Sequence, residues 1–139
     1  YYLAGPWFAE RGVALYAYDA RGFGRSPNRG VWPGRRLMSE DLRTAVTLAR
    51  REHPGLPITV IGDSMGSAAA IATFSDDNAP EIDRLVLVAP AVWGWSTMPD
   101  TYALTLWLGA HTFPYRAVSP PRNVTRTRTA SDNREALLQ

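Results

Sequence analysis

One stretch, residues 58–70, constrains the fold of this chain more than any other. An apolar, β-branched run enters it, a Gly-Asp-Ser-Met-Gly turn occupies residues 62–66, and an alanine-rich helical run leaves it. A strand, a sharp turn that exposes a serine hydroxyl and a helix whose N-terminus faces the reaction are typical of one kind of nucleophilic serine. The sequence therefore predicts Ser64 as a nucleophile, with the backbone N–H of Met65 as a donor to the developing oxyanion.

The two glycines of this turn have a steric explanation. The serine backbone in such a turn is strained, and the strand and the helix pass close to each other. We therefore expect side chains at Gly62 and Gly66 to collide with their surroundings. The alternative is a tight strand-to-helix turn with an incidental serine, and the apolar run and the helical run on either side favour the nucleophile.

Three apolar runs predict strands at residues 13–18, 58–61 and 85–89. The first and the last are continuous rather than alternating, which is typical of strands buried on both faces of a parallel sheet. Helices are predicted at residues 6–11, from an N-cap at Ser39 to the Pro-Gly pair at residues 54–55, and at residues 65–74. This alternation predicts an α/β fold with a parallel sheet of about three strands and flanking helices.

The character of the chain changes after Pro90. Residues 101–110 predict an apolar helix that is too short to span a membrane, and Ser131 is suited to cap a last helix. We divide the chain into a partial α/β core at residues 1–92 and the start of a helical cap or lid at residues 93–139. Bulky aromatic side chains crowd the first half of this second region, namely Trp93, Trp95, Trp107 and Phe113.

Composition excludes several chemistries. The chain has no cysteine, which excludes disulfides, thiolate metal sites and cysteine nucleophiles. All 15 basic residues are arginine, which excludes a P-loop lysine and a Schiff-base lysine. We predict no cofactor and no metal, and the net charge of +2 is too small to argue for nucleic acid. No signal peptide or spanning apolar run is seen, so we expect a cytoplasmic protein.

The loop at residues 19–28 holds two glycines, Gly22 and Gly24, that suggest a dinucleotide fingerprint. The third glycine position is Pro27 and no helix is predicted there, so we reject that interpretation. We expect this loop at the carboxyl edge of the sheet, beside Ser64. The spaced arginines between residues 116 and 134 can meet anionic lipid, but such spacing more often indicates a solvated face.

A catalytic triad needs a histidine and an acid, and in this chain order both follow the serine. His53 precedes Ser64 and suits a helix C-terminus, so we interpret it as a capping residue. His111 follows Ser64 but lies within the aromatic region rather than at a strand end. We assign neither histidine to the triad. Four aspartates that follow Ser64 are considered as the acid, and none of them lies just past a later predicted strand: Asp76, Asp77, Asp83 and Asp100.

The motifs at residues 16–26, 53–57, 62–66 and 85–91 together resemble the α/β-hydrolase fold. They are most similar to its monoacylglycerol lipase and lysophospholipase branch, often grouped with serine aminopeptidase-like hydrolases. The resemblance is close from residue 13 to residue 93 and looser through the cap. Ser64 matches the nucleophile and Met65 the oxyanion-hole residue. The family commonly has Gly-His-Ser-Met-Gly-Gly here, whereas this chain has Asp63 for the histidine and Ser67 for the last glycine.

The resemblance implies a fragment of a serine hydrolase that cleaves carboxylic esters, in particular those of acyl lipids, through an acyl-enzyme at Ser64. The alternatives are an amide, peptide or C–C hydrolase on the same fold, or a non-catalytic binding protein of this fold. The expected partner is a small-molecule acyl ester or lipid, with peripheral membrane contact through the cap left open. The family's His-Gly oxyanion loop is expected before Tyr1, and its triad acid and histidine after Gln139. We therefore expect an internal piece of a longer protein, without esterase activity by itself.

Overall fold

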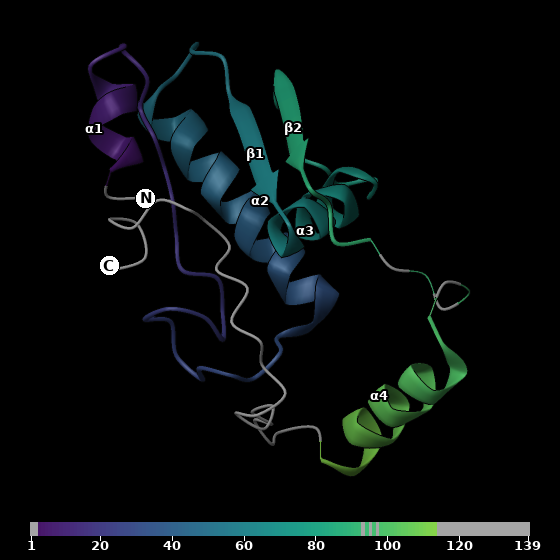
Figure 1. Ribbon diagram of the computed structural model, residues 1–139. Coiled ribbons are helices and arrows are strands. Elements are labelled where there is room, and N and C mark those ends of the chain that lie inside the picture. Colours follow the sequence, from purple (N-terminus) through teal and green to yellow (C-terminus); the bar gives the residue numbers. More distant parts are fainter. Residues whose placement is uncertain (1–2, 93, 95, 97, 114–139) are drawn as a thin grey trace.

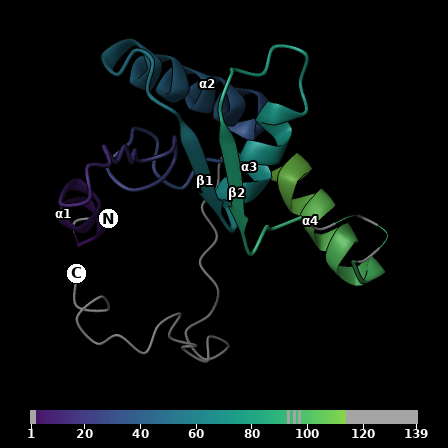
Figure 2. The same ribbon diagram turned by 90° about the horizontal axis from the view of Figure 1, so that it is seen from above.

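The computed structural model describes residues 3–92, 94, 96 and 98–113. A two-stranded sheet lies at its centre, and α2 and α3 pack together on one side of it (Figures 1 and 2). The predicted parallel α/β arrangement is confirmed. In chain order the elements are α1 (Ala4–Ala9), α2 (Gly34–Glu52), β1 (Thr59–Asp63), α3 (Met65–Phe74), β2 (Arg84–Val88) and α4 (Asp100–Thr112).

The sheet is covered on one face. β1 and β2 pair in parallel from Thr59 opposite Arg84 to Asp63 opposite Val88. Since side chains alternate along a strand, the half-buried Val60 faces α3 and Ile61, which is 57% exposed, points the other way. The prediction of a β2 strand buried on both faces is therefore wrong for the described residues, where helices cover only one side.

The strand predicted at residues 13–18 does not form. The segment runs extended in the same direction as β1, on the side of the sheet away from β2 (Figures 1 and 2). The Tyr16 hydroxyl attaches it to the end of α2, donating to Glu52 Oε2 at 2.5 Å and lying 2.9 Å from His53 Nε2. The Glu52 carboxylate raises the pKa of Tyr16, mainly by accepting this bond. The composition of this segment favours a strand, but a strand forms only where its backbone hydrogen-bonds to a neighbouring strand.

Helix α2 begins earlier than the sequence predicts. Its N-cap is Pro33 rather than Ser39, which lies buried inside the helix with a hydroxyl that has no hydrogen-bond partner among the described residues. The additional residues at the start of α2 bury Met38, and this burial explains why the helix begins before Ser39. The predicted end is confirmed, because His53 is the C-cap and its N–H donates to Ala49 O at 2.9 Å.

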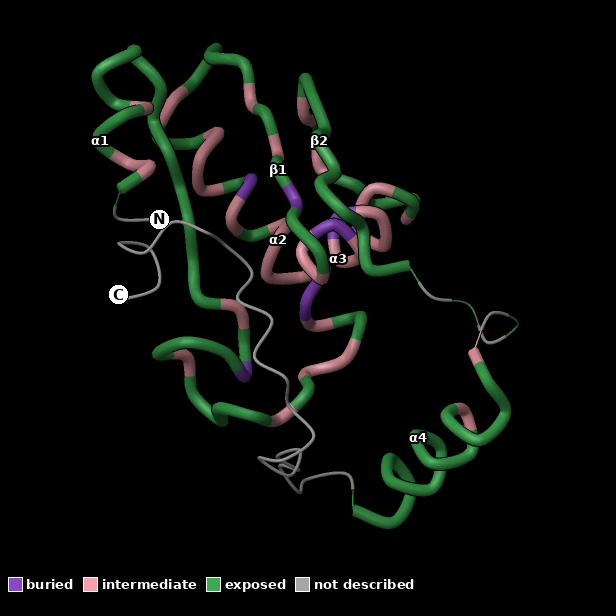
Figure 3. Tube along the Cα trace, in the orientation of Figure 1, coloured by how far each residue is buried: buried purple, intermediate pink, exposed green. Residues whose placement is uncertain are grey.

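Apart from Gly22 in the loop at residues 19–28, the buried residues lie where α2, α3 and β1 meet, as Figure 3 shows in purple. Val46 of α2 is 5% exposed, and Ala70 of α3 is fully buried. The predicted helix at residues 65–74 is confirmed with the same bounds. Alanines on α3 allow the two helices to approach closely, so this packing fixes the position of the residues at the start of α3.

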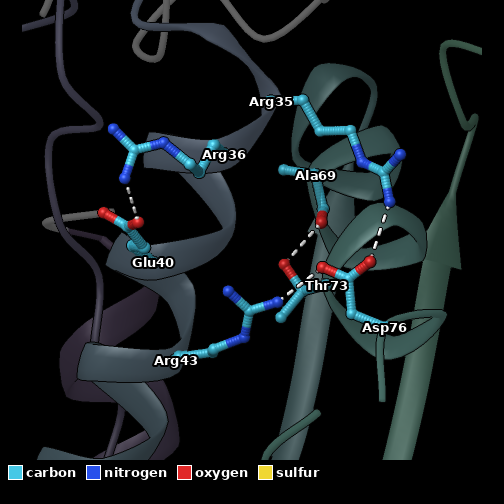
Figure 4. Close-up of polar contacts among 7 residues, drawn as sticks. All are labelled: Arg35, Arg36, Glu40, Arg43, Ala69, Thr73 and Asp76. Atoms are coloured by element: carbon cyan, nitrogen blue, oxygen red, sulfur yellow. Dashed lines mark hydrogen bonds and ion pairs between the residues drawn. The ribbon is translucent and has the colours of Figure 1, made fainter. Parts of the chain in front are cut away.

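An ion-pair cluster closes the α2–α3 interface at the end of α3 (Figure 4). The Asp76 carboxylate accepts hydrogen bonds from Arg35 at 2.9 Å and from the less exposed Arg43 at 2.6 Å. Within α3, the fully buried Thr73 donates its hydroxyl hydrogen to Ala69 O at 2.8 Å. Asp76 therefore holds the C-terminal end of α3 against the first half of α2.

We expect Asp76→Ala to lower the free energy of unfolding by about 1 kcal/mol, because it removes both bonds and leaves the Arg43 guanidinium half-buried without its carboxylate. Urea unfolding measures the loss. The matched control is Asp77→Ala, which changes the neighbouring exposed acid and is expected to alter stability by less than about 0.5 kcal/mol. Equal losses from the two substitutions would contradict the structural role of Asp76.

Helix α4 confirms the apolar helix predicted at residues 101–110, with one more residue at its start and two at its end. None of its described side chains is buried; Leu104 is 57% exposed and Trp107 is 50% exposed. No helix in the described part of the chain combines the length and apolar character needed to cross a bilayer. Trp93, Trp95, the arginines between residues 116 and 134, and Ser131 lie outside the described residues.

Candidate active site

The turn between β1 and α3 is strained at one residue. Ser64 has φ 51° and ψ −112°, a conformation that non-glycine residues rarely adopt and that costs about 1–3 kcal/mol. The end of β2 and the segment just after it hold Ser64 there, because the Ser64 N–H donates to Val88 O at 2.9 Å and the Ala91 N–H donates to Ser64 O at 3.1 Å. The strain is therefore maintained by bonds from a second strand, and such strain is concentrated at functional sites.

The Ser64 side chain is exposed and does not cap the helix that follows it. Serine is among the preferred N-cap residues and normally bonds an N–H in the first turn, so this hydroxyl is left available for other chemistry. Met65 is the first residue of α3, and its N–H has no carbonyl one turn earlier in the helix to accept it. A hydroxyl and an amide donor at the positive end of a helix thus lie next to each other.

The two glycines of the turn differ. A Cβ atom on Gly62 would lie 2.7 Å from both the N and Cα atoms of Ser67, so no larger residue fits without moving α3 away from β1. A Cβ atom on Gly66 would meet nothing within 4 Å. The steric prediction is thus confirmed for Gly62 and wrong for Gly66, because the close approach occurs on the strand side of the turn only.

Sequence reasoning did not assign a role to Ser67, although it singled the residue out as a departure from glycine. Ser67 is fully buried, and its Oγ lies 2.7 Å from Gly62 O and 3.0 Å from Val88 O. The same oxygen accepts the Val88 N–H at 3.2 Å. One hydroxyl therefore connects α3 with the carboxyl ends of both strands.

The loop at residues 19–28 lies beyond the end of the sheet toward which the strands point (Figure 1), and its place beside Ser64 stays a prediction. It is built from turns, with no helix directly after the glycines, in agreement with the rejected dinucleotide motif. The Asp19 carboxylate accepts the Arg25 N–H at 2.9 Å. Farther along, Trp32 and Met65 line one cavity of about 220 Å³ between the start of α2 and α3, together with Arg35, Met38, Ala68, Ala69 and Ala72.

Both histidines have other contacts. His53 lies beside Tyr16 before β1 begins, at the opposite end of the strand from Ser64. His111 stacks on Trp107 in α4, with ring centroids 4.4 Å apart and Nδ1 2.8 Å from Trp107 O. Neither histidine is brought to Ser64 in the described structure, in agreement with leaving both outside a triad.

The four aspartates considered for the triad lie elsewhere in the fold. Asp83 accepts the Ile58 N–H at 2.7 Å at the start of the sheet, and Asp76 belongs to the cluster between α2 and α3. Asp77 is exposed, and Asp100 lies in the first turn of α4. Across the described residues, no group of acidic and histidine side chains is arranged to hold a metal ion.

Curated proteins match part of this chain. The chain is 40% identical over 88 residues to a monoacylglycerol lipase of Mycolicibacterium smegmatis, covering 61% of this chain and 30% of the relative. It is also 40% identical over 82 residues to the uncharacterized protein YnbC of Escherichia coli, covering 57% of this chain and 14% of the relative. The chain therefore spans less than a third of the length of each. No solved structure matches.

A family model described as serine aminopeptidase, S33 matches the whole chain, residues 1–139. The two parallel strands joined through a helix, α3, are the arrangement expected for part of such a core. The chain belongs to the serine aminopeptidase S33 family and is an α/β-hydrolase.

Proposed function

We propose that the protein is a serine hydrolase that cleaves carboxylic esters of acyl lipids, with Ser64 as its nucleophile. One observation carries this proposal: the Ser64 hydroxyl is exposed, is not used to cap α3 and is fixed in a strained turn beside the first N–H of that helix. The similarity to a monoacylglycerol lipase supports the substrate class.

In the proposed reaction, Ser64 Oγ attacks the ester carbonyl carbon while a general base takes the hydroxyl proton. The carbonyl oxygen becomes an oxyanion, which the Met65 N–H stabilises at the positive end of α3. The ester C–O bond then breaks, and the departing alkoxide receives the proton from the base. Water hydrolyses the acyl-enzyme by the same steps and restores Ser64. Because His53 and His111 have other contacts, we propose that the base comes from outside the described residues.

We also propose that the region from Trp93 onward is the start of a cap that shapes an apolar acyl pocket. The apolar side chains of α4 support this, since Leu104, Leu106 and Leu108 are each 46–57% exposed in the described structure. A cap of this kind brings an apolar surface over a carboxyl-edge site and excludes water from it. Peripheral contact with a membrane through the same region is a further part of this proposal.

A second candidate is cleavage of an amide or a peptide N-terminus at the same serine. The description of the matching family as a serine aminopeptidase favours it. The serine turn serves either reaction, because both proceed through an acyl-enzyme and an oxyanion. A panel of monoacylglycerols, lysophospholipids and aminoacyl amides separates the two candidates by their kcat/KM values.

The test of the nucleophile uses protein expressed from the complete open reading frame. We expect a fluorophosphonate probe to label Ser64, as mapped by peptide mass spectrometry, and Ser64→Ala to abolish the label. The matched control is Ser75→Ala, which removes the exposed serine at the other end of α3 and is expected to leave labelling unchanged. Labelling that persists in Ser64→Ala would overturn the assignment.

A further inference from the structure

We propose that the buried hydroxyl of Ser67 is a positioning group for Ser64, acting through the end of β2. The inference rests on the proposed function, because it concerns how the nucleophile is held. Ser67 lies three residues after Ser64, inside the first turn of α3, and is fully buried. Its hydroxyl is directed not to its own helix but to backbone groups of β1 and β2.

The contacts form a chain that ends on Ser64. A hydroxyl has one hydrogen, so Ser67 donates to one carbonyl at a time, either Gly62 O at 2.7 Å or Val88 O at 3.0 Å. Its oxygen accepts the Val88 N–H at 3.2 Å. The Val88 carbonyl also accepts the Ser64 N–H, at 2.9 Å. Ser67 therefore contacts both polar groups of the residue that binds the nucleophile's backbone.

These hydrogen bonds matter because the backbone is strained at Ser64 and directly after Val88, the two residues that they connect. Ser64 has φ 51°, and Ala89, directly after Val88, has φ 42°. The bend at Ala89 lets Val88 O and the Ala91 N–H both reach Ser64. A strained turn persists only when its surroundings over-determine it, and Ser67 supplies bonds that the two-stranded ladder by itself does not.

The test compares Ser67→Ala with Thr73→Val in protein from the complete open reading frame. Both substitutions remove a fully buried α3 hydroxyl, but the Thr73 hydroxyl donates to Ala69 O in its own helix rather than to a strand. We expect Ser67→Ala to lower the fluorophosphonate labelling rate and the kcat for a p-nitrophenyl ester by about tenfold, with KM unchanged. Thr73→Val is expected to change the unfolding midpoint similarly while keeping the wild-type kcat.

Ser67→Cys provides a second variant should Ser67→Ala fail to fold, since it keeps a small side chain with a weaker donor. Its labelling rate is expected to be about threefold below wild type. Labelling at the wild-type rate in a folded Ser67 variant, or an equal loss of kcat in Thr73→Val, would overturn the positioning role. These outcomes differ from failure of the proposed function, in which the wild-type protein itself carries no label at Ser64.

Discussion

Ser64→Gly is expected to abolish ester turnover and, at the same time, to raise the free energy of unfolding by about 1 kcal/mol. The native backbone at this position, with φ 51° and ψ −112°, is open to glycine but strained for any residue with a Cβ atom. Relief of about 1–3 kcal/mol of strain exceeds the loss of about 0.5–1 kcal/mol that comes from a more flexible unfolded chain. A variant that is more stable but inactive would show that the strained backbone at Ser64 is retained because activity depends on this residue.

Ser64→Ala is the matched variant for this prediction. It removes the hydroxyl but keeps the Cβ atom, so turnover falls by at least about 10⁴-fold without the gain in stability. Urea unfolding of both variants, with turnover of a p-nitrophenyl ester, measures the two effects separately. Turnover that persists in either variant would contradict the role of Ser64, and equal stability of the two would contradict strain at this residue.

The parts that could be predicted from the sequence depend on short-range pattern. The bounds of α3, the end of α2 and the positions of Ser64 and Met65 at a strand-to-helix turn all follow from residues within a few positions of each other. Gly62 belongs to the same group, because the close approach it permits is to Ser67, five residues away. Such local signals are carried by composition and spacing alone.

The parts that could not be predicted depend on partners distant in the sequence. Residues 13–18 have the composition of a strand, yet they lie extended without a ladder and attach to α2 through Tyr16. Ser39 has the chemistry of an N-cap, but burial of Met38 extends the helix past it. The proposed role of Ser67 depends on its hydrogen bond to Val88, twenty-one residues later, and no local sequence pattern predicts this contact.

Gly62→Ala and Gly66→Ala are expected to change stability in opposite directions, although they change the same residue type on either side of Ser64. At Gly62 the new methyl group would lie 2.7 Å from backbone atoms of Ser67, and backbone cannot rotate away as a side chain can. Either α3 moves from β1 or the turn opens, and the free energy of unfolding falls by about 3 kcal/mol. At Gly66 the methyl group enters open space inside a helix, where alanine is favoured by about 0.5–1 kcal/mol.

Urea unfolding of the two variants beside the wild type measures this difference, which is expected to reach about 4 kcal/mol between them. The Gly62 variant is also expected to lose fluorophosphonate labelling of Ser64, because the collision lies within the contacts that hold the strained turn. Two variants of equal stability would show that strand and helix do not approach as closely at Gly62 as the structure places them. The strained backbone of Ser64 would then have to be held by contacts other than those among Gly62, Ser67 and Val88.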